Sequence, residues 1–325
     1  MKIINKIREI FTLKRSIQNV EHKINTNTNN IINIITKSIT EKAEQIKLNQ
    51  GLILSNQNLY FKKEDIKKNI NLAEFKVFSQ WGDDGIINFL VNYLDIENKK
   101  FIEFGVEDYT ECNTKLLLMM YNWEGLVIDG SQNNIDAIRS RVINWQFDIA
   151  TVNKFITAEN INEIISENKF NQDIGLLHID IDGNDYWIWK EISVTKPIIV
   201  IVEYNSVFGD DRPITVPYRA DFFRTDEHYS NLLFGTSLLS LCDLAEEKGY
   251  YFIGSNSNGN NAYFIRKDKI KDLKPLTCKE GFVNSKFRES LDQNHKLNYL
   301  SGDERLENIK GNKVYNTRTN SIELL

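Results

Sequence analysis

Two apolar runs of the chain end in acidic or amide side chains. One run ends at Asp180, and the next ends about twenty residues later at Glu203, with Asn205 just beyond it. Apolar runs of this length, with a helical segment between them, predict two parallel strands buried on both faces, residues 175–180 and 198–203. Ligands of such sheets bind at the carboxyl ends of the strands. We therefore expect the chemistry of the protein at this edge.

Oxygen atoms from these strand ends could hold a hard cation. Asp180, Glu203 and Asn205 would converge from adjacent strands, and carboxylate and amide oxygens suit Mg²⁺ or Ca²⁺. A metal there would bind vicinal hydroxyls and lower their pKa. In the alternative interpretation, Asp180 and Asp182 cap the helix that follows and face water, and the reaction needs no metal.

A hydroxyl that reacts as a nucleophile has to give its proton to a base. The candidate bases are His228, in a long loop over residues 205–234, and then Asp182 and Asp185. His178 precedes the strand end, so we expect it to be a hydrogen-bonded core histidine. The same loop carries three arginines that could clamp a phosphate or carboxylate of the substrate: Arg212, Arg219 and Arg224.

An earlier pair of strands also ends in acids. Residues 100–109 predict a strand that enters a turn, where Gly105 would let the backbone approach a ligand closely. Residues 125–131 predict a second strand, in which Asp129 follows Gly105 by about 25 residues. An acid at that spacing can hold the two hydroxyls of a ribose. Because Gly-x-Gly-x-x-Gly is absent, we expect a nucleoside-containing ligand without a diphosphate.

The remaining pattern alternates helices and strands. It predicts an α/β protein with a Rossmann-like, doubly wound, mostly parallel sheet, closed by an antiparallel hairpin of residues 250–254 and 261–266. A further strand is expected within residues 146–155. Helices are expected over residues 82–94, 113–121, 135–142, 157–167 with Thr157 as its cap, 186–192 and 235–248.

This order of elements resembles a class I S-adenosylmethionine-dependent methyltransferase. Residues 103–105 resemble the acid-x-Gly at the end of the family's first strand, and Asp129 resembles the acid that holds the cofactor ribose. The later glycine of that turn is replaced here by residues 107–109. The resemblance implies S-adenosylmethionine as cofactor. The residues it implies as cofactor contacts are Gln80, Asp84, Glu103, Gly105, Asp108, Asn113, Asp129, Gly130 and Ser131.

Within that superfamily, residues 179–185 resemble the Asp-x-Glu-Gly-x-Glu segment of FkbM-type methyltransferases, with Asp182 and Asp185 in place of Glu. Residues 79–84 resemble a segment found just upstream of the fold in these proteins. The resemblance covers residues 75–267 and implies transfer of a methyl group to a hydroxyl of a sugar or glycan precursor, with Mg²⁺ as an optional aid. The acceptor side would be formed by Asp180, Asp182, Asp185, Glu203, Asn205 and His228.

Two other interpretations remain open. Residues 180–183 also resemble the Asp-x-Asp-Gly motif of haloacid-dehalogenase phosphatases, which would make the protein a Mg²⁺-dependent phosphohydrolase using Asp180 and Asp182. That motif normally ends the first strand, whereas here it ends the fourth. The second alternative is a non-catalytic module that binds a nucleotide sugar or serves in assembly.

The N-terminal fifty residues differ from the rest. Ile3, Ile10, Ile17, Ile24 and Ile31 recur every seven residues, which predicts a helical, coiled-coil-like segment that packs on the body or self-associates. The Asn-rich stretch 25–30 weakens it as one continuous helix. Residues 1–48 hold nine Lys or Arg against four Asp or Glu, so peripheral contact with an anionic membrane is the alternative.

Composition sets the remaining expectations. The chain has 325 residues and a formal charge of −5, which argues against a general nucleic-acid binder. Three separated cysteines and the lack of a long apolar run predict a cytoplasmic protein, with the inner membrane face as its alternative site. We expect a helical segment (1–50), a connector (51–76), a methyltransferase-like domain (77–267) and a polar extension (268–325).

Overall fold

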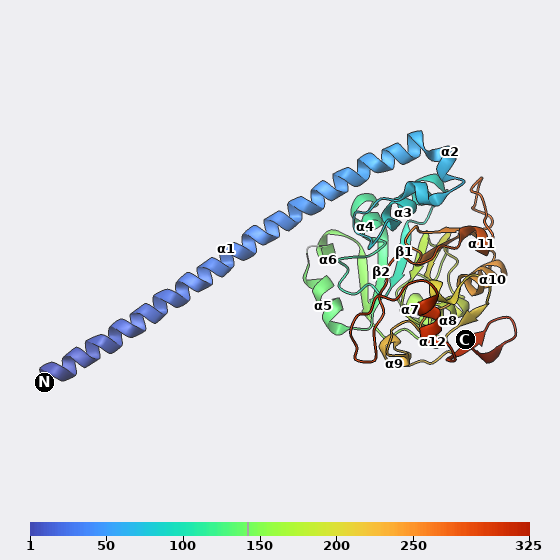
Figure 1. Cartoon of the computed structure of the whole chain (residues 1–325). Coiled ribbons are helices and arrows are strands. Elements are labelled where there is room, and N and C mark those ends of the chain that lie inside the picture. The colour runs from blue at the N-terminus through green and yellow to red at the C-terminus, as the bar shows by residue number, and fades with distance from the viewer. Residues whose placement is uncertain (142) are drawn as a thin grey trace. The chain divides into compact units, whose positions relative to one another are not determined.

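The computed structural model describes residues 1–141 and 143–325, which divide into two compact units, residues 1–50 and 51–325. The first unit belongs to one helix, α1 (Lys2–Phe61), which runs without a break through the Asn-rich stretch 25–30 (Figure 1). The five isoleucines of the heptad pattern are each more than half exposed. The predicted helical extension is therefore confirmed, and its apolar residues have no core to enter within their own unit.

Residues 51–76 belong to the second unit and are largely helical. The end of α1 is followed by α2 (Lys63–Ile66) and the short η1 (Ile70–Ala73). The Asn58 side-chain amide donates to the Ala73 carbonyl at 2.8 Å, and Ile66, Ile70 and Ala73 are buried. A segment predicted as a polar connector thus supplies part of the hydrophobic core.

The second unit is built on a seven-stranded sheet of order β3-β2-β1-β4-β5-β8-β7. The first five strands along the chain pair in parallel, β8 is antiparallel to β5, and β7 is antiparallel to β8. This confirms the predicted doubly wound sheet with its closing hairpin. The strands are β1 (Lys100–Phe104), β2 (Glu124–Asp129), β3 (Ile149–Asn153), β4 (Leu176–Ile179), β5 (Ile199–Glu203), β7 (Tyr250–Ser255) and β8 (Asn261–Arg266).

Helices cover both faces of this sheet (Figure 1). Alternate β1 residues point to opposite sides, so Ile102 enters one hydrophobic cluster and Phe101 the other. The cluster with Ile102 includes residues of α7 (Ile161–Glu167), α8 (Asp185–Glu191) and α10 (Leu238–Lys248). The cluster with Phe101 includes residues of α3 (Asp83–Tyr93), α4 (Lys115–Tyr121) and α5 (Gln132–Ser140).

The end of α5 and the start of α7 can be compared with their predicted positions. Helix α5 ends at Ser140 and is followed by α6 (Ile143–Gln146); its predicted end, Val142, lies outside the described residues. Helix α7 begins at Ile161 rather than at Thr157, and Asn160 is its N-cap residue. The Thr157 backbone N–H donates to the Asn160 side chain at 2.9 Å, so the chain forms a turn before the helix starts.

The loop after β5 and the C-terminal region form a second, antiparallel sheet of order β10-β9-β6. Buried residues Val207, Phe222, Ile309 and Val314 form a third cluster beneath it. No helix in the described part of the chain has the length and hydropathy needed to cross a bilayer. The remaining elements are η2 (Ser206–Phe208), β6 (Ile214–Thr215), α9 (Arg224–Glu227), α11 (Cys278–Gly281), α12 (Asp303–Ile309), β9 (Lys313–Asn316) and β10 (Ser321–Leu324).

Candidate active site

A cleft of about 610 Å³ lies at the carboxyl ends of β1, β4 and β5. This is where parallel sheets bind their ligands, and where the strand-end acids were expected. Among the described residues, the cleft lining brings together these predicted site residues: Gln80, Glu103, Gly105, Asn113, Asp180, Asp182 and Glu203.

Gly105, which follows β1, packs against Asp180, which follows β4. Its φ is +67°, and a Cβ atom at this position would lie 1.8 Å from the Asp180 carbonyl oxygen. The predicted close approach is therefore between two backbone segments, and it excludes every other residue type at position 105. The contact fixes the β1 turn against the strand end that carries Asp180.

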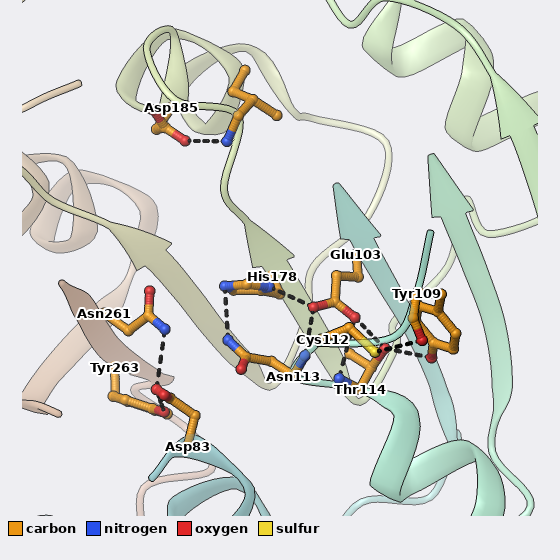
Figure 2. Close-up of polar contacts among 11 residues, drawn as sticks. Asp83, Glu103, Tyr109, Cys112, Asn113, Thr114, His178, Asp185, Asn261 and Tyr263 are labelled. Carbon is orange, nitrogen blue, oxygen red and sulfur yellow. Dashed lines mark hydrogen bonds and ion pairs between the residues drawn. The ribbon is translucent and has the colours of Figure 1, made fainter. Parts of the chain in front are cut away.

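A buried polar network lies between β1, β4 and the segment before α4 (Figure 2). Glu103 Oε1 accepts from the Asn113 backbone N–H at 2.8 Å and pairs with His178 Nδ1 at 2.9 Å, while Oε2 accepts from the Thr114 backbone N–H at 3.1 Å. Asn113 Nδ2 lies 3.1 Å from His178 Nε2. Burial opposes protonation of His178, but the hydrogen bond and charge of Glu103 outweigh it, so the pKa of His178 is raised. His178 is thus a hydrogen-bonded, buried histidine, as expected.

Asp180 and Glu203 form an acidic pair. Ile179 pairs with Val202 in the parallel ladder of β4 and β5, which places the next residue of each strand at the same edge. Burial, and then the charge of Asp182, raises the pKa of Asp180 to about 7. Burial, followed by the charge of Asp180, raises the pKa of Glu203 well above its ordinary value. A carboxyl group with a pKa near 7 is suited to accept a proton from a bound hydroxyl.

Arg224 is the loop arginine that reaches the cleft. It donates to Asp182 Oδ1 at 2.6 Å, contacts Glu289 at 3.4 Å, and its guanidinium lies 3.8 Å from the centre of the Phe234 ring. The other two predicted clamp residues are engaged elsewhere. Arg212 pairs with Glu323, and Arg219 pairs with Glu227, each at 2.5 Å. The predicted three-arginine clamp is therefore reduced to Arg224.

Asn205 does not join the two acids, so the predicted metal site is not assembled. Its Oδ1 accepts from the Val207 backbone N–H at 3.0 Å, and its Nδ2 donates to the Leu232 and Phe234 carbonyls at 2.9 Å each. These three bonds anchor the loop that follows β5. Within residues 1–141 and 143–325, no group of three or more His, Cys, Asp or Glu side chains could hold a metal ion.

Two predicted catalytic residues lie outside the described lining of the cleft. His228 Nδ1 pairs with Ser230 Oγ at 2.7 Å, and burial lowers the pKa of His228 below its ordinary value. Asp185 accepts from the Ile181 and Gly183 backbone N–H groups, both at 2.9 Å, and burial raises its pKa to about 6. Asp185 therefore holds the turn after β4 that presents Asp182, and His228 is not placed to act as the base.

Asp84 also binds backbone N–H groups, in the segment that precedes α3. Its Oδ2 accepts from the backbone N–H groups of Val77, Phe78 and Ser79, each at 2.7 Å. Burial raises the pKa of Asp84 to about 6 in spite of these bonds. Asp84 thus shapes the segment that presents Gln80, and does not itself line the cleft.

The predicted cofactor residues at the ends of β1 and β2 form hydrogen bonds and an ion pair with residues near them in the structure. Asp129 Oδ2 accepts from the Glu107 backbone N–H at 2.8 Å, and Oδ1 accepts from the Ser131 backbone N–H at 2.8 Å. Asp108 pairs with Arg141 at 2.6 Å, and Ser131 caps α5. A Cβ atom at Gly130 would lie 3.5 Å from the ring of Phe155, a cleft residue. These residues border the cleft and fix the β1 turn.

One wall of the cleft was missed by sequence reasoning. Asp83, buried at the start of α3, accepts from Asn261 Nδ2 at 3.0 Å and from the Tyr263 hydroxyl at 2.5 Å (Figure 2). It also accepts from Asn256 Nδ2 at 3.0 Å. Asn260 lies beside them and lines the cleft. We call Asn256, Asn260 and Asn261 the amide wall. The predicted hairpin could have indicated this wall, because its second strand pairs with the strand that ends at Glu203.

Comparisons with known proteins give likenesses of fold. No family model matches the chain, and no curated protein matches it. The N-terminal domain of EvdMO1 with SAH bound has 9% identity and a TM-score of 0.34, covering 51% of this chain and 72% of that one. For TehB from Haemophilus influenzae the values are 12%, 0.33, 52% and 57%. For an S-adenosylmethionine-dependent methyltransferase from Clostridium acetobutylicum they are 12%, 0.38, 64% and 99%. At these values the similarity does not identify a family.

Proposed function

We propose that the protein transfers a methyl group from S-adenosylmethionine to a hydroxyl of a sugar or glycan precursor. The observation that carries this proposal is the acidic cleft at the carboxyl ends of β1, β4 and β5, in which Gly105 packs against the strand end that bears Asp180. The bound cofactor would supply a methyl group on a positively charged sulfur, and an acidic lining favours such a group electrostatically.

The residues at the cleft fit a nucleoside-containing group. Asp129 Oδ2 accepts one hydrogen bond, from the Glu107 backbone, and a carboxylate oxygen has room for a second, such as one from a ribose hydroxyl. Glu203 Oε2 is buried and has no hydrogen-bond partner, so the cleft also holds an acceptor that a bound molecule can satisfy. We assign the cofactor to the side of β1 and β2, and the acceptor to the side of β4 and β5.

The chain's own part in the chemistry is to take the proton of the acceptor hydroxyl. Asp180 lines the cleft, and its pKa of about 7 lets it accept a proton near neutral pH. We prefer Asp180 to His228 as the base, because Asp180 lines the cleft whereas His228 is not part of the described lining. Arg224 holds the neighbouring Asp182 in place through an ion pair of 2.6 Å.

Aromatic side chains of the lining favour a sugar as the acceptor. Trp81, Phe222 and Phe287 each contribute to the cleft. Aromatic rings give an apolar surface to a ligand whose hydroxyls are then bound by a few placed polar groups. Here the placed groups are the carboxylates at the strand ends.

The test is isothermal titration of the purified protein with S-adenosylhomocysteine, with and without Mg²⁺. We expect a Kd in the micromolar range, and turnover of sugar acceptors to require S-adenosylmethionine. Absence of binding under both conditions would sink the proposal. Phosphatase assays would then test the phosphohydrolase alternative, which needs Asp182 free although it pairs with Arg224.

We also propose that residues 1–50 associate with a second copy of this chain. The helix is continuous, and its heptad isoleucines are exposed on it at a period of seven. Apolar residues at that period form the seam of a left-handed coiled coil. An anionic membrane surface is the competing partner, because residues 1–48 carry an excess of basic side chains.

A further inference from the structure

Glu203 and Asn261 present two unpaired acceptor atoms from neighbouring strands. They are paired residues in the antiparallel ladder of β5 and β8, so their side chains lie on the same face of the sheet. Both line the cleft, and they are only 8% and 3% exposed. Glu203 Oε2 and Asn261 Oδ1 are buried and have no hydrogen-bond partner.

The orientation of the Asn261 amide follows from its neighbour. Asp83 Oδ1 lies 3.0 Å from Asn261 Nδ2 and also accepts from Asn256 Nδ2 and the Tyr263 hydroxyl. A carboxylate can only accept, so the amide must turn its nitrogen toward Asp83. Figure 2 shows the Asn261 oxygen directed away from Asp83. Asp83 therefore holds the Asn261 amide so that its free oxygen is presented as an acceptor.

Two buried acceptors without a donor are costly unless a bound molecule supplies the donors. An unpaired buried polar atom loses its hydrogen bond to water and gains none in return. In the described lining, acidic side chains also outnumber basic ones, with Asp83, Glu103, Glu107, Glu111, Asp180, Asp182, Glu203 and Glu289 set against Arg224 and His178, and His178 is paired with Glu103. Arg224 is already paired with Asp182 and Glu289. The missing group should therefore carry several N–H or O–H donors and a positive charge.

An ammonium group meets this description better than Mg²⁺ does. It offers three donors and one positive charge in a compact head. Mg²⁺ demands near-octahedral oxygen ligands, and Asn205, the third ligand expected from sequence, is committed to its own loop. A neutral hydroxyl would supply a donor but no positive charge, whereas a bound cation would lower the raised pKa of Glu203 and let its carboxyl ionise.

We propose that Glu203 and Asn261 bind the free amino group of the acceptor, which makes the acceptor an amino sugar with an unacylated nitrogen. This rests on the proposed methyl transfer and names its substrate class. In the order β1-β4-β5-β8, the two side chains lie two and three strands from the β1 turn, or about 10–15 Å at ~4.8 Å per strand. That distance separates them from the cofactor side of the cleft. The amino group anchors the acceptor, and a hydroxyl near Asp180 takes the methyl group.

The experiment uses the full chain saturated with S-adenosylhomocysteine and follows ligand binding by titration. The probes are 2-, 3-, 4- and 6-amino-hexoses, each paired with its N-acetyl counterpart. We expect at least one free amino sugar to bind about tenfold or more tightly than its N-acetyl form, because a hydrogen bond to a charged group is worth ~1.5–3 kcal/mol. Glu203→Gln should remove this preference, and so should Asn261→Leu.

Glu289→Gln is the matched control, since it removes one carboxylate from the same cleft and leaves both unpaired acceptors in place. It should keep the preference for the free amine. If the Asn261 variant does not fold, Glu203→Gln carries the test, because it keeps the shape of the side chain.

Two results would overturn the inference. In the first, no free amine binds better than its N-acetyl form although S-adenosylhomocysteine binds normally. In the second, Glu203→Gln weakens S-adenosylhomocysteine itself, which would assign the site to the amino group of the cofactor. Failure of S-adenosylhomocysteine to bind the wild-type protein is a different outcome, because it overturns the proposed function.

Discussion

The N-terminal unit and the cleft of the second unit are incomplete in opposite ways. Along α1, large apolar side chains such as Ile17 and Ile24 are exposed. In the cleft, acceptor oxygens of Glu203 and Asn261 are buried without donors. Exposed apolar area costs about 25 cal/mol per Å², and an unpaired buried oxygen costs about 1–3 kcal/mol. Each region would therefore be stabilised by a partner. For the helix that partner is an apolar surface, and for the cleft it is a cation with several hydrogen-bond donors.

The largest expected effect concerns Asp180. Asp180→Asn should lower turnover by about 10²–10⁴-fold, because the base that takes the hydroxyl proton is removed. Binding of S-adenosylhomocysteine, measured by titration, should stay within about twofold if Asp180 acts on the acceptor side. His228→Ala serves as the comparison variant and should keep most of the turnover. Equal losses in the two variants would contradict the assignment of the base.

A second prediction tests whether the two halves of the cleft depend on the contact between Gly105 and Asp180. Gly105→Ala should lower the free energy of unfolding by about 3 kcal/mol or more, because its Cβ would overlap the Asp180 carbonyl oxygen. Gly311→Ala is the matched control: its φ is also positive, at +84°, but nothing lies within 4 Å. It should cost about 1 kcal/mol in the same urea titration. Similar losses at both positions would mean that backbone strain alone matters.

The exposed helix face gives the third prediction. Replacing Ile17 and Ile24 together by Glu should weaken self-association by about 100-fold or more, measured by sedimentation equilibrium, because charges would enter the apolar seam. Replacing Phe11 and Ile32 by Glu adds the same charge to exposed positions off the heptad seam and should change association little. A wild-type chain that is monomeric but binds anionic vesicles would favour the membrane alternative.

The smallest effect is a pH dependence of stability. The pKa of Asp180 is about 7 in the folded chain, above its ordinary 3.8, so folding favours the protonated form. The stability from this group is complete below pH 3.8 and is lost as the pH rises to about 7. Asp180→Asn cannot ionise, so between pH 4 and 6 it should gain about 2 kcal/mol relative to wild type in urea unfolding. Asp148→Asn, at an exposed position outside the cleft lining, serves as control, and a flat difference for Asp180→Asn would refute the shift.

The parts of the molecule that follow a regular pattern could be predicted from sequence. Apolar runs ending in acids placed Asp180 and Glu203 at one edge, because parallel strands end together. The sheet and its closing hairpin followed from the same periodicity. The C-terminal region gave no such signal, because β9 and β10 are short and only the long-range pairing of β9 with β6 joins them to a sheet.

The hydrogen-bond partners of the loop side chains could not be predicted from sequence. Asn205, His228 and Asp185 bond to groups within their own turns, and short polar side chains commonly compete for nearby backbone in this way. Conversely, Asp83 at the start of α3 contacts Asn261 of β8 across a separation of 178 residues, and the register of β5 and β8 pairs Asn261 with Glu203. Residue type shows which groups can do chemistry, and tertiary pairing decides which of them are free to do it.

The link between β6 and β9 also bears on biosynthesis. Arg224 lies in the loop after β6, and β6 pairs with β9. Its partner Glu289 lies in the C-terminal region, which also contains β9. A chain emerges from the ribosome at ~5–20 residues per second, so roughly 100 residues separate β5 from β9 by some 5–20 s. During that interval the cleft lacks one side, whereas α1 has already emerged in full. If residues 1–50 associate as proposed, two nascent chains could pair through their helices before either one completes its cleft.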